Sequence, residues 1–210
     1  MLKFNNKVLH INDKWLNPTV SPEPPGPSFD SVTIGTQTWM TKNLNIDDGQ
    51  GGVYIVENVE ANGLNMGKQY YYTPEAAIRI SNSIPGWHLP SKEEFQTLAS
   101  YVGTNSASKL KSTSGWDNNA NGTDDYLFNG EPTGYVINND LNDNDLTGMT
   151  FHDNGLILTC WSSTRERVDP DMSMYAYYAL NLTYNSNDIY VSGNILYYCE
   201  LSSVRLIKDT

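Results

Sequence analysis

Positive charge is scarce in this sequence. Its 210 residues include 13 lysines and arginines against 24 aspartates and glutamates, which gives a net charge of -11 at pH 7. Nucleic acids and anionic membrane surfaces are bound through clusters of lysine and arginine, and here the basic residues are scattered along the chain. The composition therefore argues against nucleic acid or an anionic membrane as the partner.

Long apolar runs and cysteine are also scarce. No stretch approaches the roughly 18 apolar residues that a membrane-spanning helix needs. The first ten residues lack the apolar core and the cleavage site of a secretory signal peptide. We therefore expect synthesis in the cytoplasm and no membrane insertion. Cys160 and Cys199 are too few for a disulfide framework, and two reduced thiols are the simplest interpretation.

The chain divides into three parts. Residues 1–17 alternate apolar and polar side chains around two short polar turns, which predicts a module of two or three very short strands. Because so small a β unit is marginally stable alone, we expect it to attach to the main domain, to its own copies or to a larger assembly. Residues 18–30 contain five prolines and predict an extended, semi-rigid linker. Residues 31–210 form the main domain.

Two helices are expected early in the main domain. Thr73 and Pro74 supply a cap and a first helical position for TPEAAIRISNS. Ser91 and Glu94 form a capping box at the start of SKEEFQTLASYVG, which Gly103 ends.

Strands are expected mainly late in the chain. VTIGTQTWM and residues 53–56 predict early strands, whereas residues 112–155 are rich in Gly, Asn, Asp and Thr and predict mostly loop. After residue 156 the segments LILTCWSS, YAYYALNLTY, DIYVSG, NILYYC and SSVRLIK predict antiparallel strands. Early helices followed by late strands indicate an α+β fold.

Half of the fourteen tyrosines lie in the stretch from Met174 to Tyr198. They alternate there with Asn, Ser and Asp. Core strands also favour Val, Ile and Phe, whereas Tyr mixed with Ser and Asn is typical of binding surfaces. Tyrosine gives a rigid, amphipathic contact at low cost in conformational entropy. The stretch is thus either an aromatic sheet or a recognition surface.

Six motifs carry a resemblance to a known family: VTIGTQTWMTKNLN, MGKQYYYTPEAA, PGWHLPSKEEFQTL, GWDNNANGTDD, CWSSTRE and SVRLIK. Their order and spacing resemble the Fibrobacter succinogenes major paralogous (FISUMP) domain over roughly residues 32–208, and PGWHLPSKEEF is the most specific motif. The resemblance implies a fold similar to C-type lectin-like domains and formylglycine-generating enzymes. That fold would hold the two helices and the late antiparallel strands, after the short β N-terminal module.

Aromatic residues and a histidine in these motifs also have a plain structural interpretation. Trp39, Trp87 and Trp161 lie beside Gly, Pro or strand residues and are expected in the core, where each buries about 200 Å². His88 has no second histidine near it in sequence. We therefore expect a structural histidine rather than a metal ligand or a catalytic base.

In C-type lectin-like folds the late loops and strands form the ligand-binding face, which corresponds here to Thr164–Ser202. Within it, ALNLTY predicts Leu180 and Leu182 inward and Asn181 and Thr183 outward. The tyrosines are expected as anchors, the Asn and Asp residues as a hydrogen-bonding rim, and arginine as a hot spot. The predicted ligand-binding residues are Arg165, Arg167, Asp169, Asp171, Tyr175, Tyr177, Asn185, Asn187, Asp188, Tyr190, Tyr197 and Tyr198.

The same region resembles the diversified end of variable proteins that diversity-generating retroelements edit in phages and bacteria. Asn codons changed at adenines yield Tyr, Ser and Asp but not Lys, Glu, Gln, Trp or Met, and residues 167–199 lack the first four of these, although they contain two Met. The resemblance implies a non-enzymatic receptor-binding or adhesion module whose partner is a cell-surface protein or glycan. Residues 1–17 resemble the start of some phage tail proteins, which implies a virion-associated protein, or alternatively a cell-surface one.

Three alternatives stay open. The late face is an oligomer contact if the protein is a structural subunit. A formylglycine-generating-enzyme-like oxidase would use Cys160 and Cys199. No cofactor is expected, although calcium would find oxygen ligands in two Asx-rich loops. These are Asp117, Asn118, Asn119, Asn121, Asp124 and Asp125 in the first loop, and Asp140, Asn142, Asp143, Asn144 and Asp145 in the second.

We expect Tyr197→Ala and Tyr198→Ala to weaken ligand binding without unfolding the domain, because exposed tyrosine anchors contribute to the interface and not to the core. Binding and circular dichroism measured on the same samples check this. Loss of the folded spectrum would reassign both residues to the core.

Overall fold

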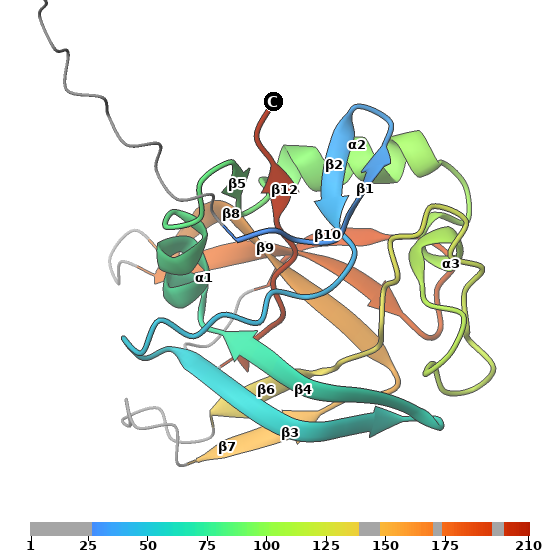
Figure 1. Ribbon diagram of the computed structural model, residues 1–210, viewed down its shortest axis with the longest axis horizontal. Helices are drawn as coiled ribbons and strands as arrows, with labels where there is room; N and C mark the ends of the chain where they lie inside the picture. Colours follow the sequence, from blue (N-terminus) through green and yellow to red (C-terminus); the bar gives the residue numbers. More distant parts are fainter. Residues whose placement is uncertain (1–26, 139–147, 170–173, 195–199) are drawn as a thin grey trace, which may run out of the picture.

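A computed structural model describes residues 27–138, 148–169, 174–194 and 200–210 (Figure 1). The strands predicted within residues 1–17, most of the linker and the predicted strand NILYYC lie mainly outside the described residues. The elements, in chain order, are β1 (Ser31–Ile34), β2 (Gln37–Met40), β3 (Val53–Ala61), β4 (Leu64–Tyr72), α1 (Pro74–Ser81), β5 (Trp87–His88), α2 (Lys92–Val102), α3 (Ser106–Leu110), β6 (Tyr135–Asn138), β7 (Met149–His152), β8 (Ile157–Asp169), β9 (Met174–Thr183), β10 (Tyr190–Asn194), β11 (Glu200–Leu201) and β12 (Ile207–Lys208).

Helices are few and the paired strands are antiparallel, in small sheets, so the α+β class fits. One sheet has the order β1-β2-β12-β5 and joins the first and last elements of the domain. A second has the order β10-β9-β8, and a third β11-β6-β7, while β3 and β4 form a hairpin. In the view of Figure 1 the β8-β9-β10 sheet lies below α2 and above the β3-β4 and β6-β7 strands, with α1 at its left.

Both predicted helices are confirmed, with their caps. The Thr73 side chain accepts a hydrogen bond from the Ala76 N–H at the start of α1, and Ser91 and Glu94 form the reciprocal capping box of α2. The short helix α3 was not predicted. Asn105 at its start makes no side-chain cap, so the sequence lacks the signal that marks the other two helices. None of the helices in the described residues is long and apolar enough to cross a membrane.

The structure lengthens one predicted strand and adds two short strands to a segment expected to be mostly loop. The early strand at residues 53–56 extends to Ala61 and returns as β4 through a turn at Asn62 and Gly63, both with positive φ. The expected loop at 112–155 contains β6 and β7. The β3–β4 hairpin carries a local signal, the Asn62-Gly63 turn, so its pairing could be predicted from neighbouring residues. Strands β6 and β7 carry no such signal, and β6 also pairs with β11, which is distant in sequence.

The β8–β9 pair is buried on both faces. On one face Trp161 and Ala179 pack in a core cluster with Ala76 and Ala77 of α1. On the other face Leu158 and Leu180 pack with the residues of α2, and Trp39 stacks on Phe95 with ring centroids 5.5 Å apart. Trp39, Trp87 and Trp161 are buried, as predicted.

His88 joins the end of the chain to helix α2. Its Nδ1 lies 2.6 Å from Asp209 Oδ1 and its Nε2 lies 2.9 Å from Glu94 Oε1. Partial burial acts to lower the pKa of His88, but the two carboxylates outweigh it and the pKa is raised. The imidazole is thus held at both nitrogens, which agrees with the structural role expected for it.

Arg205 is the central polar group of the core. It is 1% exposed, and its Nε donates to Asn43 Oδ1 at 2.8 Å. Its guanidinium also donates to the carbonyls of Met40, Phe128 and Asn129 and lies over the Phe128 ring, 4.6 Å from the centroid. The Arg205 side chain therefore links the segment before β12 to the end of β2, to Asn43 and to the long loop before β6.

Arg205→Met should lower the free energy of unfolding by about 3 kcal/mol, because three buried carbonyls lose their donor. Urea denaturation measures the change. Arg79→Met is the matched control, because Arg79 makes a partly exposed ion pair with Asp48 and its loss should cost less than about 1 kcal/mol. Equal losses in the two variants would contradict the assigned role of Arg205.

Candidate functional site

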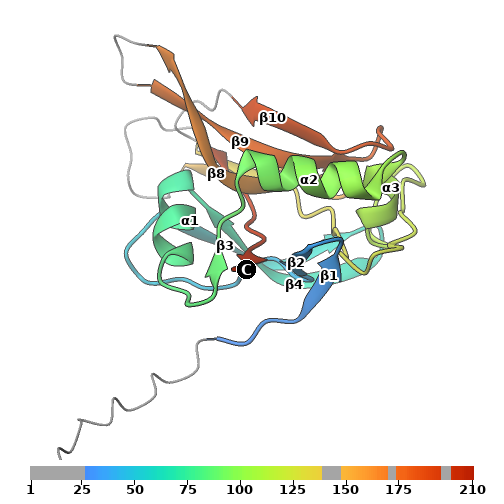
Figure 2. The same ribbon diagram turned by 90° about the horizontal axis from the view of Figure 1, so that it is seen from above.

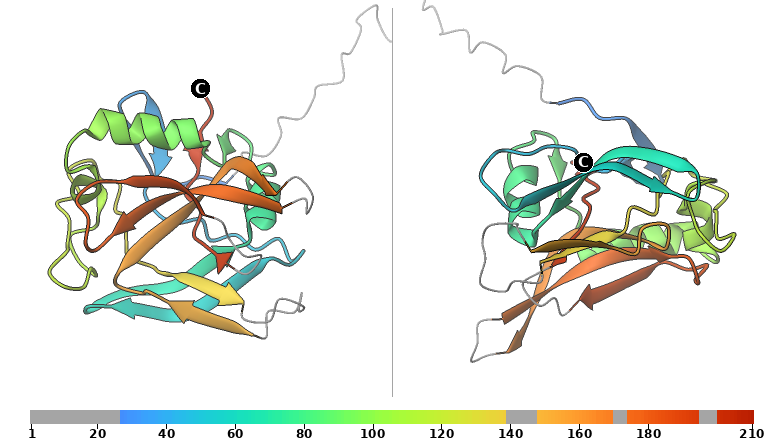
Figure 3. Two further views of the ribbon diagram at one scale, coloured as in Figure 1. Left: turned by 180° about the vertical axis from the view of Figure 1, so that it is seen from behind. Right: turned by 90° about the horizontal axis from the view of Figure 1, so that it is seen from below.

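The predicted ligand-binding residues that the structure describes fall in three separate places on the β8-β9-β10 sheet. The far end of β8 and the start of β9 project past α1, and we call this part the arm (Figure 2; Figure 3). The turn between β9 and β10 lies at the opposite end of the sheet. Between them, the outer part of the sheet borders a hollow.

The arm presents arginine and tyrosine in register. Arg165 pairs with Tyr177, and Arg167 pairs with Tyr175. The Arg165 guanidinium lies 4.1 Å from the centroid of the Tyr175 ring, and Nη1 donates to Tyr177 Oη at 3.3 Å. Arg165, Arg167 and Tyr175 are exposed. Stacking and hydrogen bonding hold Arg165 in one orientation, which lowers the entropy that binding would cost.

Tyr177 differs from the prediction. It is only 6% exposed and packs edge-on against Trp161, with ring centroids 6.3 Å apart. Its hydroxyl reaches Glu75 Oε1 of α1 at 3.4 Å. Tyr177 therefore positions Arg165 and fills the core, and it does not present a face to a ligand.

The turn between β9 and β10 supports helix α3. The Asn187 carbonyl accepts hydrogen bonds from the N–H groups of Ala107 and Ser108. Asp188 Oδ1 accepts from the Asn105 N–H at 2.9 Å, and Asn185 Oδ1 accepts from a neighbouring threonine hydroxyl. Asn187 and Asp188 thus have structural partners, although the side chains of all three predicted residues remain exposed.

Tyr190 stands at the edge of a hollow of about 660 Å³, which we call the sheet hollow. Its side chain is 54% exposed. The floor is polar and ordered: Thr159 Oγ1 donates to Asn181 Oδ1 at 3.0 Å, and Asn181 Nδ2 donates to Ser192 Oγ at 3.3 Å. The lining residues are Tyr135, Asp153, Ile157, Thr159, Asn181, Thr183, Tyr190, Ser192, Gly193 and Glu200.

The hollow also holds acidic groups. Glu200 accepts a hydrogen bond from Ser202 Oγ at 3.1 Å, and burial raises its pKa to about 7. Burial, and then Asp153, raise the pKa of Tyr135 to about 12. At neutral pH the hollow therefore offers hydroxyl donors, an amide and a carboxyl that exchanges its proton near pH 7, a set suited to a polar, uncharged or cationic group.

Most lining residues of the hollow were missed from the sequence. The alternation in ALNLTY correctly places Leu180 and Leu182 in the core and puts Asn181 and Thr183 on the opposite face. Asn181, expected to point outward, is nevertheless buried at 7% exposed, because the Thr159–Asn181–Ser192 network packs around it. Tyr135, Asp153 and Glu200 come from β6, a turn and β11, and only strand pairing brings these segments together. Asp171, Tyr197 and Tyr198 lie outside the described residues, as does the side chain of Asp169.

Cys160 is fully buried on β8, and burial raises its pKa to about 12. A catalytic cysteine needs the opposite environment, one that lowers the thiol pKa. Cys199, its partner in the oxidase alternative, lies outside the described residues.

In the first Asx-rich loop two of the side-chain oxygens accept hydrogen bonds from backbone N–H groups. Asn121 Oδ1 accepts from the Trp116 N–H at 3.0 Å, and Asp124 Oδ1 accepts from the Asn129 N–H at 2.7 Å. The second loop, Asp140–Asp145, lies outside the described residues. Within the described ranges, no group of three or more His, Cys, Asp or Glu side chains is placed to hold a metal ion.

Glu200→Gln should change how stability depends on pH. The pKa of Glu200 in the folded state is about 7, above the ordinary value of 4.5. Between these two values the carboxyl ionises in the unfolded chain but stays protonated in the folded domain, so the wild-type domain loses stability as the pH rises from about 4.5 to about 7. The variant should be more stable than wild type by roughly 2 kcal/mol at about pH 8 and no more stable at about pH 4. Urea denaturation at several pH values tests this, with the exposed Glu57→Gln as control. A gain of equal size at both pH values would contradict it.

Comparison with known proteins identifies the family of the domain. Residues 32–208 match the family model described as the Fibrobacter succinogenes major domain. No curated protein and no solved structure matches the chain. The matched range runs from β1 to β12 and contains the whole β8-β9-β10 sheet with its arm and hollow. This chain therefore belongs to the Fibrobacter succinogenes major domain family.

Proposed function

We propose that this protein is a non-enzymatic recognition module with a C-type lectin-like fold, which binds a cell-surface protein or glycan at the sheet hollow. The observation that carries the proposal is the hollow itself, with the exposed Tyr190 at its edge and the ordered Thr159–Asn181–Ser192 network in its floor. Concave sites with a few fixed polar groups are the usual form of ligand pockets.

The chemistry of the lining supports a polar ligand. Hydroxyl groups of Thr, Ser and Tyr both donate and accept, and Asn181 adds an amide. Tyr190 supplies the aromatic contact that often anchors an interface. The arm, with its oriented Arg165, adds a second contact region on the same sheet.

The state of one thiol supports recognition over the formylglycine-generating-enzyme-like oxidase. Cys160 is buried away from the hollow's lining residues and its pKa is raised rather than lowered. A cysteine in this state is a packing residue and not a nucleophile.

In the finer form of the proposal the protein is a phage receptor-binding or surface adhesion module whose late region is diversified. The Tyr, Asn, Ser and Asp content between residues 174 and 198 supports it. Sequencing the gene and its flanks for a near-copy of this region that differs only at adenines, beside a reverse transcriptase gene, tests diversification directly. Absence of such a copy leaves a fixed binding face.

Tyr190→Ala should weaken binding about tenfold or more, because one anchoring aromatic ring leaves the interface. The fluorescently labelled full chain is first applied to a glycan array and to an array of purified bacterial surface proteins, and the affinity for any hit is then measured for each variant. Tyr101→Ala is the control, since Tyr101 is a 59% exposed tyrosine on α2.

A wild-type chain that binds nothing on either array, or a Tyr190→Ala variant that binds as wild type does, would contradict the proposal. Circular dichroism confirms that each variant is folded. A solution mass showing an oligomer that covers the hollow would instead support the structural-subunit alternative.

A further inference from the structure

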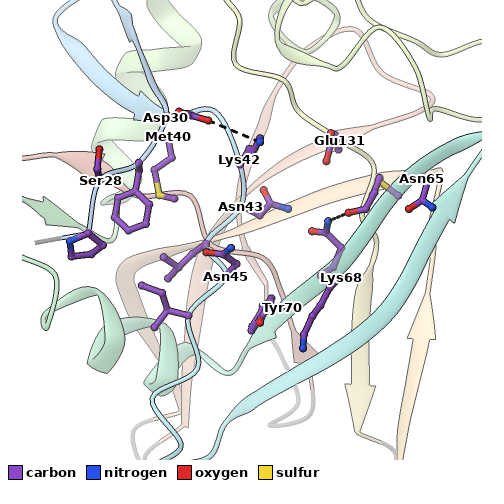
Figure 4. Close-up of a pocket in the computed structure, with 16 residues that line it drawn as sticks. Ser28, Asp30, Met40, Lys42, Asn43, Asn45, Asn65, Lys68, Tyr70 and Glu131 are labelled. Atoms are coloured by element: carbon purple, nitrogen blue, oxygen red, sulfur yellow. Dashed lines mark hydrogen bonds and ion pairs between the residues drawn. The ribbon is translucent and has the colours of Figure 1, made fainter.

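A second concave site lies between the segment that follows β2 and the strand β4. We call it the β4 slot; its volume is about 610 Å³. Figure 4 shows Asn43 and Asn45 on one wall facing Lys68 and Tyr70 on the other. The lining is mixed: polar and charged side chains form the larger part of it, and the apolar or aromatic ones are Pro27, Phe29, Met40, Leu44, Ile46, Met66 and Tyr70.

The slot borders a free strand edge. Tyr72 exchanges both of its backbone hydrogen bonds with Ser202, at 2.9 and 3.1 Å, so its N–H and C=O point away from β3. Successive residues of an antiparallel strand point these groups to opposite edges, so Tyr70 directs its own N–H and C=O to the same edge as Tyr72. Within the described residues these two groups of Tyr70 have no backbone partner beyond the hairpin.

The segment that pairs with Tyr72 of β4, at Ser202, does not continue along β4. Two residues after Ser202, the Val204 carbonyl accepts from the Leu44 N–H instead. The Tyr72 hydroxyl meanwhile fixes the opposite wall by bonding the backbone of Leu44 and Ile46. The two walls therefore diverge around an unpaired edge, which is the geometry that accepts an added extended strand.

The rim of the slot is electrically balanced. Lys42 Nζ lies 4.0 Å from Asp30 and Lys68 Nζ lies 3.1 Å from Glu57. Both lysines of the rim are thus already paired with carboxylates, and nothing in the rim selects an acidic segment. The whole chain has a net charge of -11, so its long-range electrostatic field favours the binding of a basic segment.

Residues 1–17 have the properties that the slot requires. They alternate apolar and polar side chains as a strand does, and they contain Lys3, Lys7 and Lys14 against Asp13, a net charge of +2 in a chain of net charge -11. Their linker reaches the slot directly, because Pro27 forms part of its lining.

The linker also indicates which copy supplies the strand. Residues 18–26 contain four prolines, and a proline-rich stretch of nine residues extends to roughly 28 Å. An extended linker of this length would favour a slot on another molecule over the slot in which it ends. We propose that the β4 slot of one molecule binds residues 1–17 of a second copy as an added β-strand, and that the exchange is reciprocal in a symmetric dimer.

Sedimentation of the full chain over a wide range of concentrations tests the proposal. We expect a reversible dimer of twice 23.5 kDa. Ile11→Asp should raise the dimer dissociation constant about tenfold or more, because an apolar strand residue loses its burial. The neighbouring Asn12→Asp adds the same charge at the alternate position and should have a smaller effect. A synthetic peptide of residues 1–17 should compete and release monomers.

A variant of the slot itself completes the test. Asn45 is exposed and points into the slot in Figure 4, so Asn45→Trp should fill the slot and give monomers, whereas Gln96→Trp on the exposed face of α2 should not. A wild-type chain that is monomeric throughout, equal effects of Ile11→Asp and Asn12→Asp, or a dimer unchanged by Asn45→Trp would each overturn the proposal. None of these outcomes depends on what the sheet hollow binds.

Discussion

The arrangement of this domain depends on one buried cation, Arg205. A guanidinium taken out of water is costly unless its donors are satisfied, and here carbonyl oxygens and one amide oxygen satisfy them, with no carboxylate within ion-pair distance among the described residues. The main-chain carbonyls come from the end of β2 and from the long loop before β6, and the amide oxygen comes from Asn43 in the segment after β2. Arg205 therefore fixes regions that no regular sheet would bring together.

Around this point the family motifs meet. TWMTKNL supplies Met40 and Asn43, and SVRLIK supplies Arg205 and the short strand β12. Asn43 also donates to Thr133 and Ser203, so a single amide connects the same segments. Because these contacts are polar and directional, they specify one arrangement more strictly than apolar packing alone does.

The buried centre determines where binding surfaces are available. The middle of the β8–β9 pair is covered on both faces by core clusters, so only its two ends reach solvent. One end is the arm with Arg165 and Tyr175, and the other is the β9–β10 turn. Beside that turn, polar side chains of the sheet meet β6 and β11 and leave the sheet hollow. A carboxyl such as Glu200 is held there at a cost to stability, which is common where a site needs a polar group in a partly dry place.

Local signals in the sequence determined the parts of the fold that depend on neighbouring residues. The caps at Thr73 and Ser91 fixed the starts of α1 and α2, the turn at Gly35 fixed the β1–β2 hairpin, and the alternation of ALNLTY fixed which side chains of β9 enter the core. Each of these depends on contacts within a few residues, which composition and spacing record.

Only the tertiary structure decided the rest. Strand β6 pairs with β11, and Tyr72 of β4 exchanges backbone hydrogen bonds with Ser202, and both partners are distant in sequence. The burial of Tyr177 follows from the position of α1. The sequence pointed to Tyr190 in the late region, but Tyr135 and Glu200 join it only because β11 pairs with β6. A tyrosine in a strand looks the same in sequence whether it faces solvent or a neighbouring helix, since that choice is made by packing between elements and not by the residue itself.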